Sequence, residues 1–263
     1  MLAPSSSFWE DFSDVDNTLH VSSPLFPLKQ VAKNYEKTVL IPMTVNDYLN
    51  APQEYFTLKS PRKTIEMLHD KLLFKEFLVE SSLGEYAPRL LDPQSYLQAP
   101  FMLKRTDLLG GQGVFKIEGS NHYKWARESA HILGHPYLLE EFIRGDIELV
   151  THLICKKGQI LWSVTLEGGI PLQSQVNLGA FATRISKING KACEVLREIV
   201  RLSNYSGPAS VNYKVWNGQP YIFDFNPRLG GSLFSKPFRE QARRSIRAFL
   251  DHAELSYVSG SLE

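Results

Sequence analysis

Apolar residues recur at helical spacing in several parts of the chain. After Ser60, which can cap a helix, and Pro61, which suits its first position, apolar side chains follow three or four positions apart as far as Gly84. Such spacing places them on one face of an α-helix, so we expect a helical stretch here that is broken once. Periodicity and composition predict further helices over residues 122–134, 191–202 and 235–252.

Short apolar runs bounded by turn residues predict the strands. Asn217-Gly218 is the strongest hairpin signal in the chain and separates strands expected over residues 210–216 and 220–225. The turn sequence at residues 156–159 joins two more, over 148–154 and 160–166. The remaining expected strands cover residues 38–41, 101–103, 114–117 and 137–143. Helices that alternate with antiparallel hairpins indicate an α+β fold.

Composition and charge exclude several classes of protein. The chain has 263 residues, of which 43% are hydrophobic, enough for one large or two small globular domains. A net charge of +1 favours neither nucleic acid nor an anionic membrane as a partner. No apolar run approaches the ~20 residues of a membrane span. Cys155 and Cys193 form no CxxC pattern, and the N-terminus lacks the features of a signal peptide, so we expect a cytoplasmic protein with reduced thiols.

The first chemical signal is a lysine followed by a glycine-rich run. Lys104 precedes Gly110-Gly111-Gln112-Gly113 at the tip of the hairpin expected between residues 101 and 117. Glycines let backbone N–H groups approach a phosphate closely, and a lysine adds positive charge. The run lacks GK[ST] and no helix obviously follows it, so it is neither a Walker A motif nor a Rossmann motif. A purely structural hairpin tip is the alternative interpretation.

The second signal is an acidic pair inside an apolar run. Glu140 and Glu141 lie between Leu139 and Ile143, and Glu148 follows. The edge of a strand can offer N–H and C=O groups to an adenine ring, and nearby carboxylates can accept from the adenine amine or the ribose hydroxyls. A solvated strand edge is the structural alternative.

The third signal is the string Asp224-Phe225-Asn226-Pro227-Arg228, with Asn212 on the partner strand. Strand alternation places Asp224 and Asn226 on one face. A carboxylate and an amide supply the oxygen ligands that suit Mg²⁺. Arg228 is placed to hold a phosphate or a carboxylate through two hydrogen bonds. A structural Asp–Arg pair at a strand end is the alternative.

In their order along the chain these blocks resemble the ATP-grasp superfamily. Asp70-Lys71 resembles its early lysine block, and the glycine run resembles its phosphate loop. Glu140 to Glu148 resembles its adenine hinge and ribose carboxylate. Asn212 with the Asp224 string resembles its metal hairpin, most like that of carbamoyl-phosphate synthase and its relatives. The resemblance spans roughly residues 60–239.

The resemblance implies an ATP enclosed by two α+β subdomains. It divides the chain into an abbreviated N-terminal segment at 1–58, a small subdomain with a glycine-rich lid at 59–136 and a large subdomain at 137–263. Asp224 and Asn226, with Asn212 as a weaker ligand, would bind Mg²⁺ or Mn²⁺, and Arg228, Lys104 and Asn226 would be catalytic. The implied nucleotide site comprises Lys71, Lys104, Gly110, Gly111, Gly113, Glu140, Glu141, Phe142, Ile143 and Glu148.

The reaction implied is the ATP-dependent joining of a small-molecule carboxylate, such as an amino acid or a peptide, to an amine. The γ-phosphoryl group would activate the carboxylate as an acyl phosphate, and amide, ADP and phosphate would be released. A nucleotide-binding regulatory or scaffold protein with little turnover is the alternative from another class. A carboxylase or kinase type is a further alternative, although nothing resembles a biotin-carrier segment.

Three departures from the family pattern bear on this expectation. Asp224 stands where a glutamate is usual, and Asn212 stands where Glu, Asp or Gln is usual, which favours one tightly held metal over two. Residues 1–58 are also shorter than the usual N-terminal domain. We therefore expect a reduced domain, a partner chain or homo-oligomer that replaces it, or a fragment of a longer protein.

Overall fold

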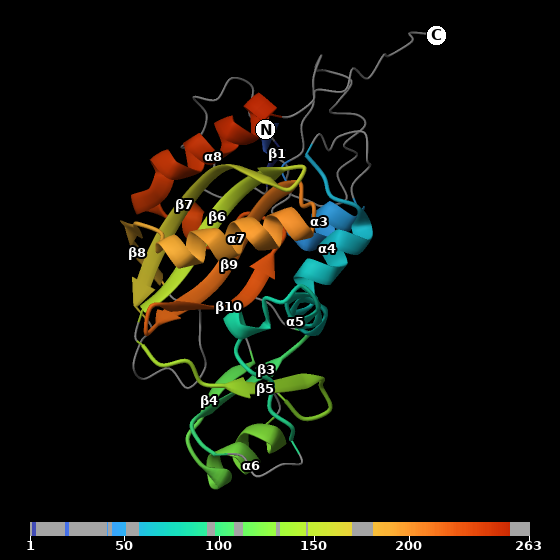
Figure 1. The fold of residues 1–263 in the computed structure, drawn as a ribbon, viewed down its shortest axis with the longest axis vertical. Coiled ribbons are helices and arrows are strands. Elements are labelled where there is room, and N and C mark those ends of the chain that lie inside the picture. Colours follow the sequence, from blue (N-terminus) through green and yellow to red (C-terminus); the bar gives the residue numbers. More distant parts are fainter. Residues whose placement is uncertain are drawn as a thin grey trace.

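A computed structural model describes residues 2–3, 19–20, 41, 44–50, 58–93, 98–107, 113–129, 132–145, 147–169 and 181–252. They form two main sheets, one above the other along the long axis (Figure 1). The larger is antiparallel, in the order β10-β9-β6-β7-β8, and the smaller has the order β4-β3-β5. The expected α+β architecture is confirmed. The larger sheet comprises β6 (Ile147–Lys156), β7 (Gln159–Gly169), β8 (Phe181–Ser186), β9 (Gly207–Trp216) and β10 (Gln219–Asn226).

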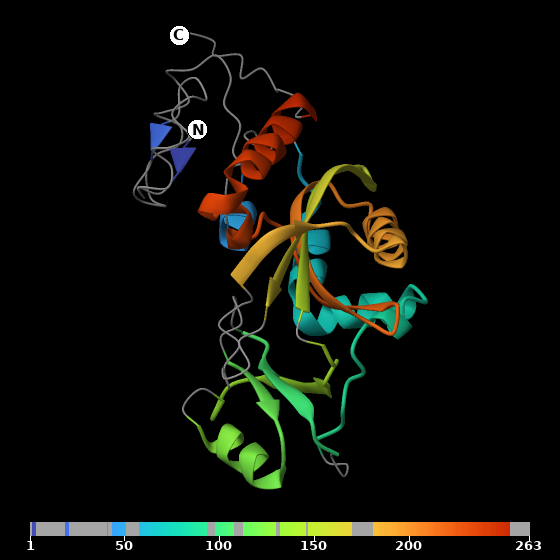
Figure 2. The ribbon, with the colours of Figure 1, turned by 90° about the vertical axis from the view of Figure 1, so that its left-hand side faces the viewer.

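Helices cover both faces of the larger sheet (Figure 2). On one face, α7 (Gly190–Leu202) packs Leu196 and Ile199 into a core with Val211 and Phe225 of the sheet. On the other face, α8 (Arg239–His252) packs Ile246 and Phe249 against Ile154. The expected basic helix at 235–252 therefore begins at Arg239, after two 3-10 turns, η3 (Gly231–Phe234) and η4 (Lys236–Phe238).

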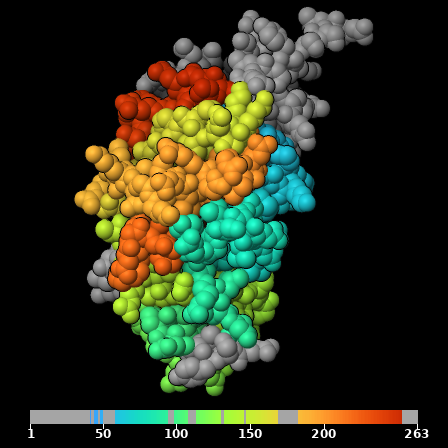
Figure 3. All heavy atoms as spheres, viewed as in Figure 1, coloured from blue at the N-terminus to red at the C-terminus, as the bar shows by residue number. Residues whose placement is uncertain are grey.

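The helical stretch after Ser60 is broken once, as expected. α4 (Arg62–His69) and α5 (Lys71–Glu80) meet at Asp70, whose carboxylate accepts from the N–H groups of Leu72 and Leu73 at 2.8 and 3.0 Å. Asp70 therefore caps the second helix. Both helices share the core of α7, and α5 and α7 lie side by side in the space-filling view (Figure 3).

The expectation that Ser60 caps the first helix is wrong. Pro61 occupies the capping position and makes no side-chain hydrogen bond there. The Ser60 hydroxyl instead donates to the carbonyl of Ser206 at 3.0 Å and accepts from its N–H at 2.7 Å. The Ser60 hydroxyl thus bonds to the backbone of Ser206, which is distant in sequence, and not to the N-terminus of its own helix.

The smaller sheet comprises β3 (Phe101–Arg105), β4 (Val114–Ile117) and β5 (Tyr137–Glu141), and α6 (Ser120–Glu128) covers it. The expected hairpin between β3 and β4 is confirmed. The helix expected at 122–134 ends earlier, at Glu128, because residues 132–134 form a turn. The free edge of β5 is covered by residues 89–91, since the Leu91 N–H donates to the Leu139 carbonyl at 2.9 Å.

Some elements were missed by the pattern or fall outside the described residues. β8 pairs with β7 but was not predicted, and the strand expected at 38–41 lies outside the described residues except for Ile41. Among the residues that the structure describes, no helix is both long and apolar enough to cross a membrane. The short elements not yet given are β1 (Leu2–Ala3), β2 (Leu19–His20), α3 (Val45–Asn50) and η2 (Gly84–Tyr86).

Candidate functional site

A bulge in β10 decides which of its side chains face the smaller sheet. Ile222 pairs with Tyr213, but Asp224 pairs with Asn212, so Phe223 is the extra residue between the two pairs. Ile222 and Phe225 consequently lie in the core with α7, whereas Asp224 and Asn226 lie on the opposite face. The expected pairing of Asp224 and Asn226 on one face is confirmed, and so is the position of Asn212 opposite Asp224. In a regular strand, Ile222 would have shared their face.

Asn212 links this strand pair to a second carboxylate. Its Nδ2 donates to Oε1 of Glu148 on β6 at 3.0 Å, so Oδ1 is the atom of Asn212 that could contact a metal ion. Burial raises the pKa of Glu148 despite the Asn212 hydrogen bond and the nearby charge of Lys104. The structure therefore places Glu148, expected to contact ribose, beside the expected metal ligands.

Lys104 reaches this group from the smaller sheet. Its Nζ forms an ion pair with Oε1 of Glu140 on β5 and lies 4.9 Å from the ring centroid of Phe223 on β10. Burial would lower the pKa of Lys104, but the charges of Glu140 and Asp224 outweigh it and the pKa is raised. The two sheets therefore meet at a lysine that stays charged.

A second lysine, missed by the sequence analysis, joins the same carboxylate. Nζ of Lys75 lies 2.7 Å from Oε2 of Glu140, and both side chains are buried. Burial opposes ionisation of Glu140, yet the two lysine charges lower its pKa. Both oxygens of Glu140 are thus occupied by lysines, which favours a role in holding them over the nucleotide contact that the resemblance implies.

Lys71, the lysine expected at the phosphates, lies four residues before Lys75. It begins α5, and its charge contributes, after burial, to the lowered pKa of His69 at the α4–α5 break. Its contact with phosphate remains a prediction. Lys75 could have been found from the sequence, because it follows Lys71 at i+4 and lies between the apolar residues Phe74 and Leu78.

The expected adenine hinge is held by a further buried lysine. Nζ of Lys214 on β9 donates to the carbonyls of Ile143 and Gly145 at 3.3 and 2.7 Å. It also lies 5.5 Å from the ring centroid of Phe142. The Glu141 N–H donates to the Arg89 carbonyl at 2.9 Å, whereas the Ile143 N–H has no hydrogen bond to another described residue. Of the hinge groups expected at adenine, the Ile143 N–H is therefore the donor left for a ligand.

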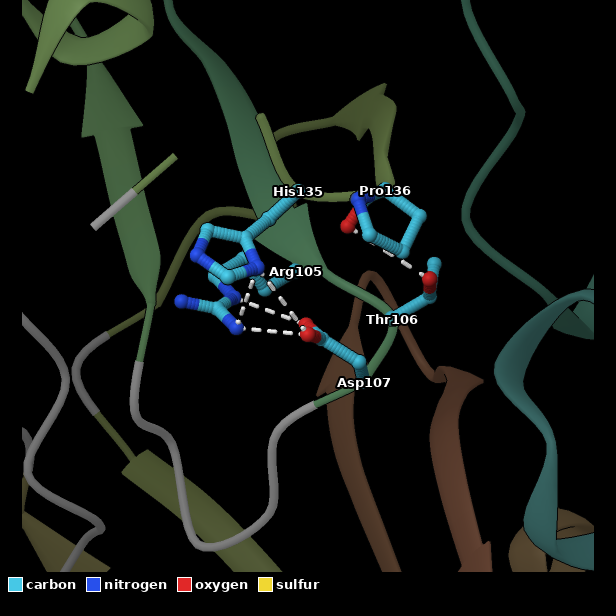
Figure 4. Close-up of polar contacts among 5 residues, drawn as sticks. All are labelled: Arg105, Thr106, Asp107, His135 and Pro136. Atoms are coloured by element: carbon cyan, nitrogen blue, oxygen red, sulfur yellow. Dashed lines mark hydrogen bonds and ion pairs between the residues drawn. The ribbon is translucent and has the colours of Figure 1, made fainter. Parts of the chain in front are cut away.

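The two sides of the glycine run are tied together at its base. The Arg105 N–H donates to the Gly113 carbonyl at 2.9 Å, and Nε of Arg105 donates to Oδ1 of Asp107 at 2.7 Å. Figure 4 shows Arg105, Asp107 and His135 pointing toward one another, with Nη2 of Arg105 3.0 Å from Nδ1 of His135. The hydrogen bond from Arg105 lowers the pKa of Asp107 to about 2. Gly110 and Gly111 lie outside the described residues.

Arg228 lies just beyond β10, where none of the described carboxylates pairs with it. Its Nη1 donates to the carbonyl of Leu229 at 2.9 Å, and burial lowers its pKa. No carboxylate among the described residues forms an ion pair with it, so the alternative of a structural Asp–Arg pair finds no support. A half-buried guanidinium of this kind is suited to an anionic ligand.

The acidic groups are few for a metal centre. Among the residues that the structure describes, no three His, Cys, Asp or Glu side chains gather closely enough to hold a metal ion. Among the described residues, the sequence-predicted oxygen donors on this face are the carboxylate of Asp224 and the amides of Asn212 and Asn226, with the carboxylate of Glu148 beside them. This donor set fits a single hard cation whose remaining ligands come from a bound phosphate and water.

The sequence comparisons find one distant relative. No protein-family profile matches the chain. The C-terminal section of the carbamoyl phosphate synthase large chain from Aquifex aeolicus is 22% identical over 186 residues, which cover 65% of this chain and 34% of that protein. The chain therefore spans about a third of the length of this curated relative.

Structural similarity is broader. D-alanine–D-alanine ligase from Bacillus anthracis superposes with a TM-score of 0.62 at 14% identity. The match covers 96% of this chain and 94% of that ligase. Phosphoribosylamine–glycine ligase from Thermotoga maritima has a TM-score of 0.63 at 16% identity, and the match covers 87% of this chain and 65% of that ligase. Carboxyaminoimidazole ribonucleotide synthase from Aspergillus clavatus, crystallised with ATP, has a TM-score of 0.57 at 20% identity. This match covers 88% of this chain and 64% of the synthase. The chain thus spans just under two thirds of the last two proteins.

The order of the sequence blocks, the two facing sheets and these similarities lead to the same classification. The ATP-grasp fold that the resemblance implies is confirmed.

Proposed function

We propose that this protein binds Mg²⁺-ATP and uses it to join a carboxylate to an amine. The observation that carries the proposal is the position of Lys104. It extends from the smaller sheet, pairs with Glu140 and lies over Phe223, next to Asp224 on the larger sheet. A phosphate chain between the two sheets would meet a fixed cation from one side and a metal ligand from the other.

The charge balance at Glu140 favours a polyanionic ligand. Two buried lysines, Lys75 and Lys104, share this one carboxylate. A phosphate that approaches them adds the negative charge that the pair lacks, and it does so where water provides little screening. Glu140 would hold both ammonium groups in place before the nucleotide arrives, so that little reorganisation is needed on binding.

The hinge supports adenine as the base. The Ile143 N–H can donate to a ring nitrogen such as N1 of adenine, while Lys214 occupies the Ile143 carbonyl. Lys214 also fixes the Gly145 carbonyl and lies close to Phe142, so the hinge is held rigidly between the two sheets. A rigid hinge positions the base without an ordering cost on binding.

Asp224, Asn226 and the Oδ1 of Asn212 would hold Mg²⁺. When bound, the metal would neutralise charge on the phosphate oxygens and orient the γ-phosphoryl group. The role of the protein is positioning, and Arg228 would hold the substrate carboxylate in line with the γ-phosphorus. A carboxylate oxygen would bond to that phosphorus while the bond to the bridging oxygen breaks, which releases ADP.

The second step would form the amide. An amine attacks the carbonyl carbon of the acyl phosphate, phosphate leaves with the C–O bonding electrons, and the amine loses a proton to solvent. Two of the similar structures are named as ligases of alanine and of glycine, which supports small amino acids as a first class of substrates to test. A cytoplasmic location fits an enzyme that uses ATP and remains part of the proposal.

The test is ATP-dependent product formation by the purified chain. Mg²⁺-ATP should raise the melting temperature, because a ligand that binds only the native state stabilises it. ADP release should then depend on both partners in a screen of amino acids and short peptides, with the product identified by mass. Lys104→Met should cut turnover by about 100-fold, whereas Lys124→Met, at an exposed position on α6, should not. No thermal shift at millimolar Mg²⁺-ATP would refute nucleotide binding.

The scarcity of carboxylates at the metal face favours a second candidate. An ATP-binding regulatory or scaffold protein would need the nucleotide site but not turnover. It would show the thermal shift with Mg²⁺-ATP and no ADP release with any amine. The same screen therefore separates the two functions.

A further inference from the structure

The ring of His152, buried on β6, supports the loop that follows Arg228. The Gly230 N–H donates to Nδ1 of His152 at 3.3 Å, and Oγ of Ser232 lies 3.1 Å from its Nε2. A Cβ atom at Gly230 would lie 2.8 Å from Cε1 of His152 and 3.1 Å from Oγ of Ser210, so only glycine fits against the ring. The loop is therefore packed against this one histidine.

The hydrogen bonds determine where the proton lies on the imidazole. A ring nitrogen that accepts from a backbone N–H carries no proton, so Nδ1 is unprotonated and Nε2 carries the proton. Burial, with the nearby charge of Arg228, lowers the pKa of His152 to about 3, so the ring stays neutral at physiological pH. Nε2–H is thus a donor, and Oγ of Ser232 is its acceptor.

This assignment fixes the direction of the Ser232 hydroxyl. Its oxygen accepts from His152, which leaves the O–H as a donor to another group. Among the described residues the Ser232 hydroxyl has no acceptor of its own, and Ser232 is only half-buried. Four residues earlier, the guanidinium of Arg228 has no carboxylate partner in the described part of the chain either. Ser232, which contacts His152, and Arg228, whose charge acts on it, thus have donor groups without an acceptor side chain among the described residues.

We infer that His152 is a positioning residue that fixes the Ser232 hydroxyl as a hydrogen-bond donor beside Arg228, and that the two donors together select the carboxylate of the substrate to be phosphorylated. The inference rests on the proposed function, because it names a selectivity element of the same site. A carboxylate can accept from both half-buried donors and carries the charge opposite to that of Arg228, whereas a neutral oxygen lacks that charge and an ammonium group cannot accept from either donor.

The test follows acyl-phosphate formation with hydroxylamine as the amine and an equimolar mixture of the twenty amino acids as the carboxylate source. Ser232→Ala should raise the KM for the mixture by about 10-fold, the value of one such hydrogen bond, with the KM for ATP unchanged. His152→Phe keeps a ring without its nitrogens and should have the same effect. His152→Gln can accept from Gly230 and donate to Ser232, so it should remain close to wild type.

The controls separate positioning from general damage. Ser163→Ala, at an exposed position on β7, should change neither KM. The double variant His152→Phe with Ser232→Ala should be no worse than either single variant, because both remove the same donor. The inference is overturned by an unchanged carboxylate KM in Ser232→Ala, or by a His152→Gln variant as impaired as His152→Phe.

A spectroscopic measurement tests the protonation of His152 without any measurement of turnover. In protein labelled with ¹⁵N-histidine, the NMR spectrum of His152 at pH 7 should show the proton on Nε2. A proton on Nδ1 would overturn the inference whatever the activity. Because this measurement uses the wild-type protein, it tests the inference even if the His152→Phe variant does not fold. Absence of hydroxamate from the wild type would refute the proposed ligase activity itself, while the Nε2 proton would still support the assigned direction of Ser232.

Discussion

Asp224 lies opposite Asn212 across the β9–β10 ladder on the face turned to the smaller sheet, and the bulge at Phe223 puts it there. The same bulge leaves Ile222 on the core side, next to Phe225. Because side chains alternate along a strand, Ile222 and Asp224 could not lie on opposite faces without an extra residue between them. The bulge thus allows Ile222 to pack in the core while Asp224 lies on the opposite face with the other expected metal ligands.

The first prediction concerns the metal. Asp224→Asn removes the charge but keeps the shape, so it should abolish turnover and metal binding while the fold is retained. Calorimetric titration of Mg²⁺ with and without a non-hydrolysable ATP analogue measures this. We expect negligible affinity for Mg²⁺ in the free protein and strong coupling to nucleotide. Unchanged affinity in nucleotide-loaded Asp224→Asn would exclude it as a ligand, and Asp251→Asn, at the exposed end of α8, is the control.

The second prediction concerns Asn212. Its Nδ2 donates to Glu148, so Asn212→Asp replaces that donor with a second carboxylate beside a buried one. Without metal the variant should melt at a lower temperature, because like charges repel at a site with little water. With Mg²⁺ and the ATP analogue its affinity for metal should exceed that of wild type. A variant that binds metal no more tightly would indicate that Oδ1 of Asn212 faces away from the ion.

The third prediction separates two lysines of α5. Lys75→Met leaves Glu140 with one of its two buried partners, so it should lower the free energy of unfolding by about 3 kcal/mol. Adding Glu140→Gln should deepen that loss, because Lys104 would then be buried without its carboxylate partner. Lys71→Met should instead weaken ATP binding with little change in stability, if Lys71 contacts the phosphates as the sequence predicts. Urea denaturation and nucleotide titration distinguish these effects, with Lys63→Met on α4 as the exposed control.

The fourth prediction concerns the base of the glycine run. Gly113 has a φ of +66°, and a Cβ there would lie 2.8 Å from Cδ of Arg105, whose guanidinium is held by Asp107 and His135. Gly113→Ala should therefore be more destabilising than Gly134→Ala, where φ is +77° but nothing lies within 4 Å. The left-handed backbone costs roughly 1 kcal/mol at either position. In thermal denaturation, the additional loss of stability in Gly113→Ala over that in Gly134→Ala therefore measures the clash with Arg105. Equal losses would show that Arg105 moves aside.

The fifth prediction is a pH dependence. His152 has a folded-state pKa of about 3 against an ordinary value of 6.5, so between these values the unfolded chain binds a proton that the folded protein does not. The stability contributed by neutral His152 is therefore complete above pH 6.5 and is lost as the pH falls, by up to about 1.4 kcal/mol per pH unit. His152→Gln should reduce this slope by one proton between pH 6 and 4.5. Identical slopes for wild type and variant would contradict a neutral buried histidine.

Much of the fold follows from local patterns in the sequence. Asn217-Gly218 predicts its hairpin because the turn requires positive φ, and Asn217 has a φ of +51°. The apolar spacing of α7 predicts its buried face, and the order of the lysine, glycine, glutamate and aspartate blocks indicates the ATP-grasp fold through its resemblance to that superfamily. Each of these signals depends on residues close together in the chain.

Only the tertiary structure decided which polar groups meet. Lys75 on α5 and Lys104 on β3 converge on Glu140 of β5, and Ser60 bonds to Ser206 instead of capping its own helix. The bulge at Phe223, the hydrogen bond between Asn212 and Glu148, and the proton on Nε2 of His152 likewise depend on partners far apart in sequence. Local periodicity determines which face of an element is apolar, but contacts between strands and helices determine which polar side chains are brought together on the other face.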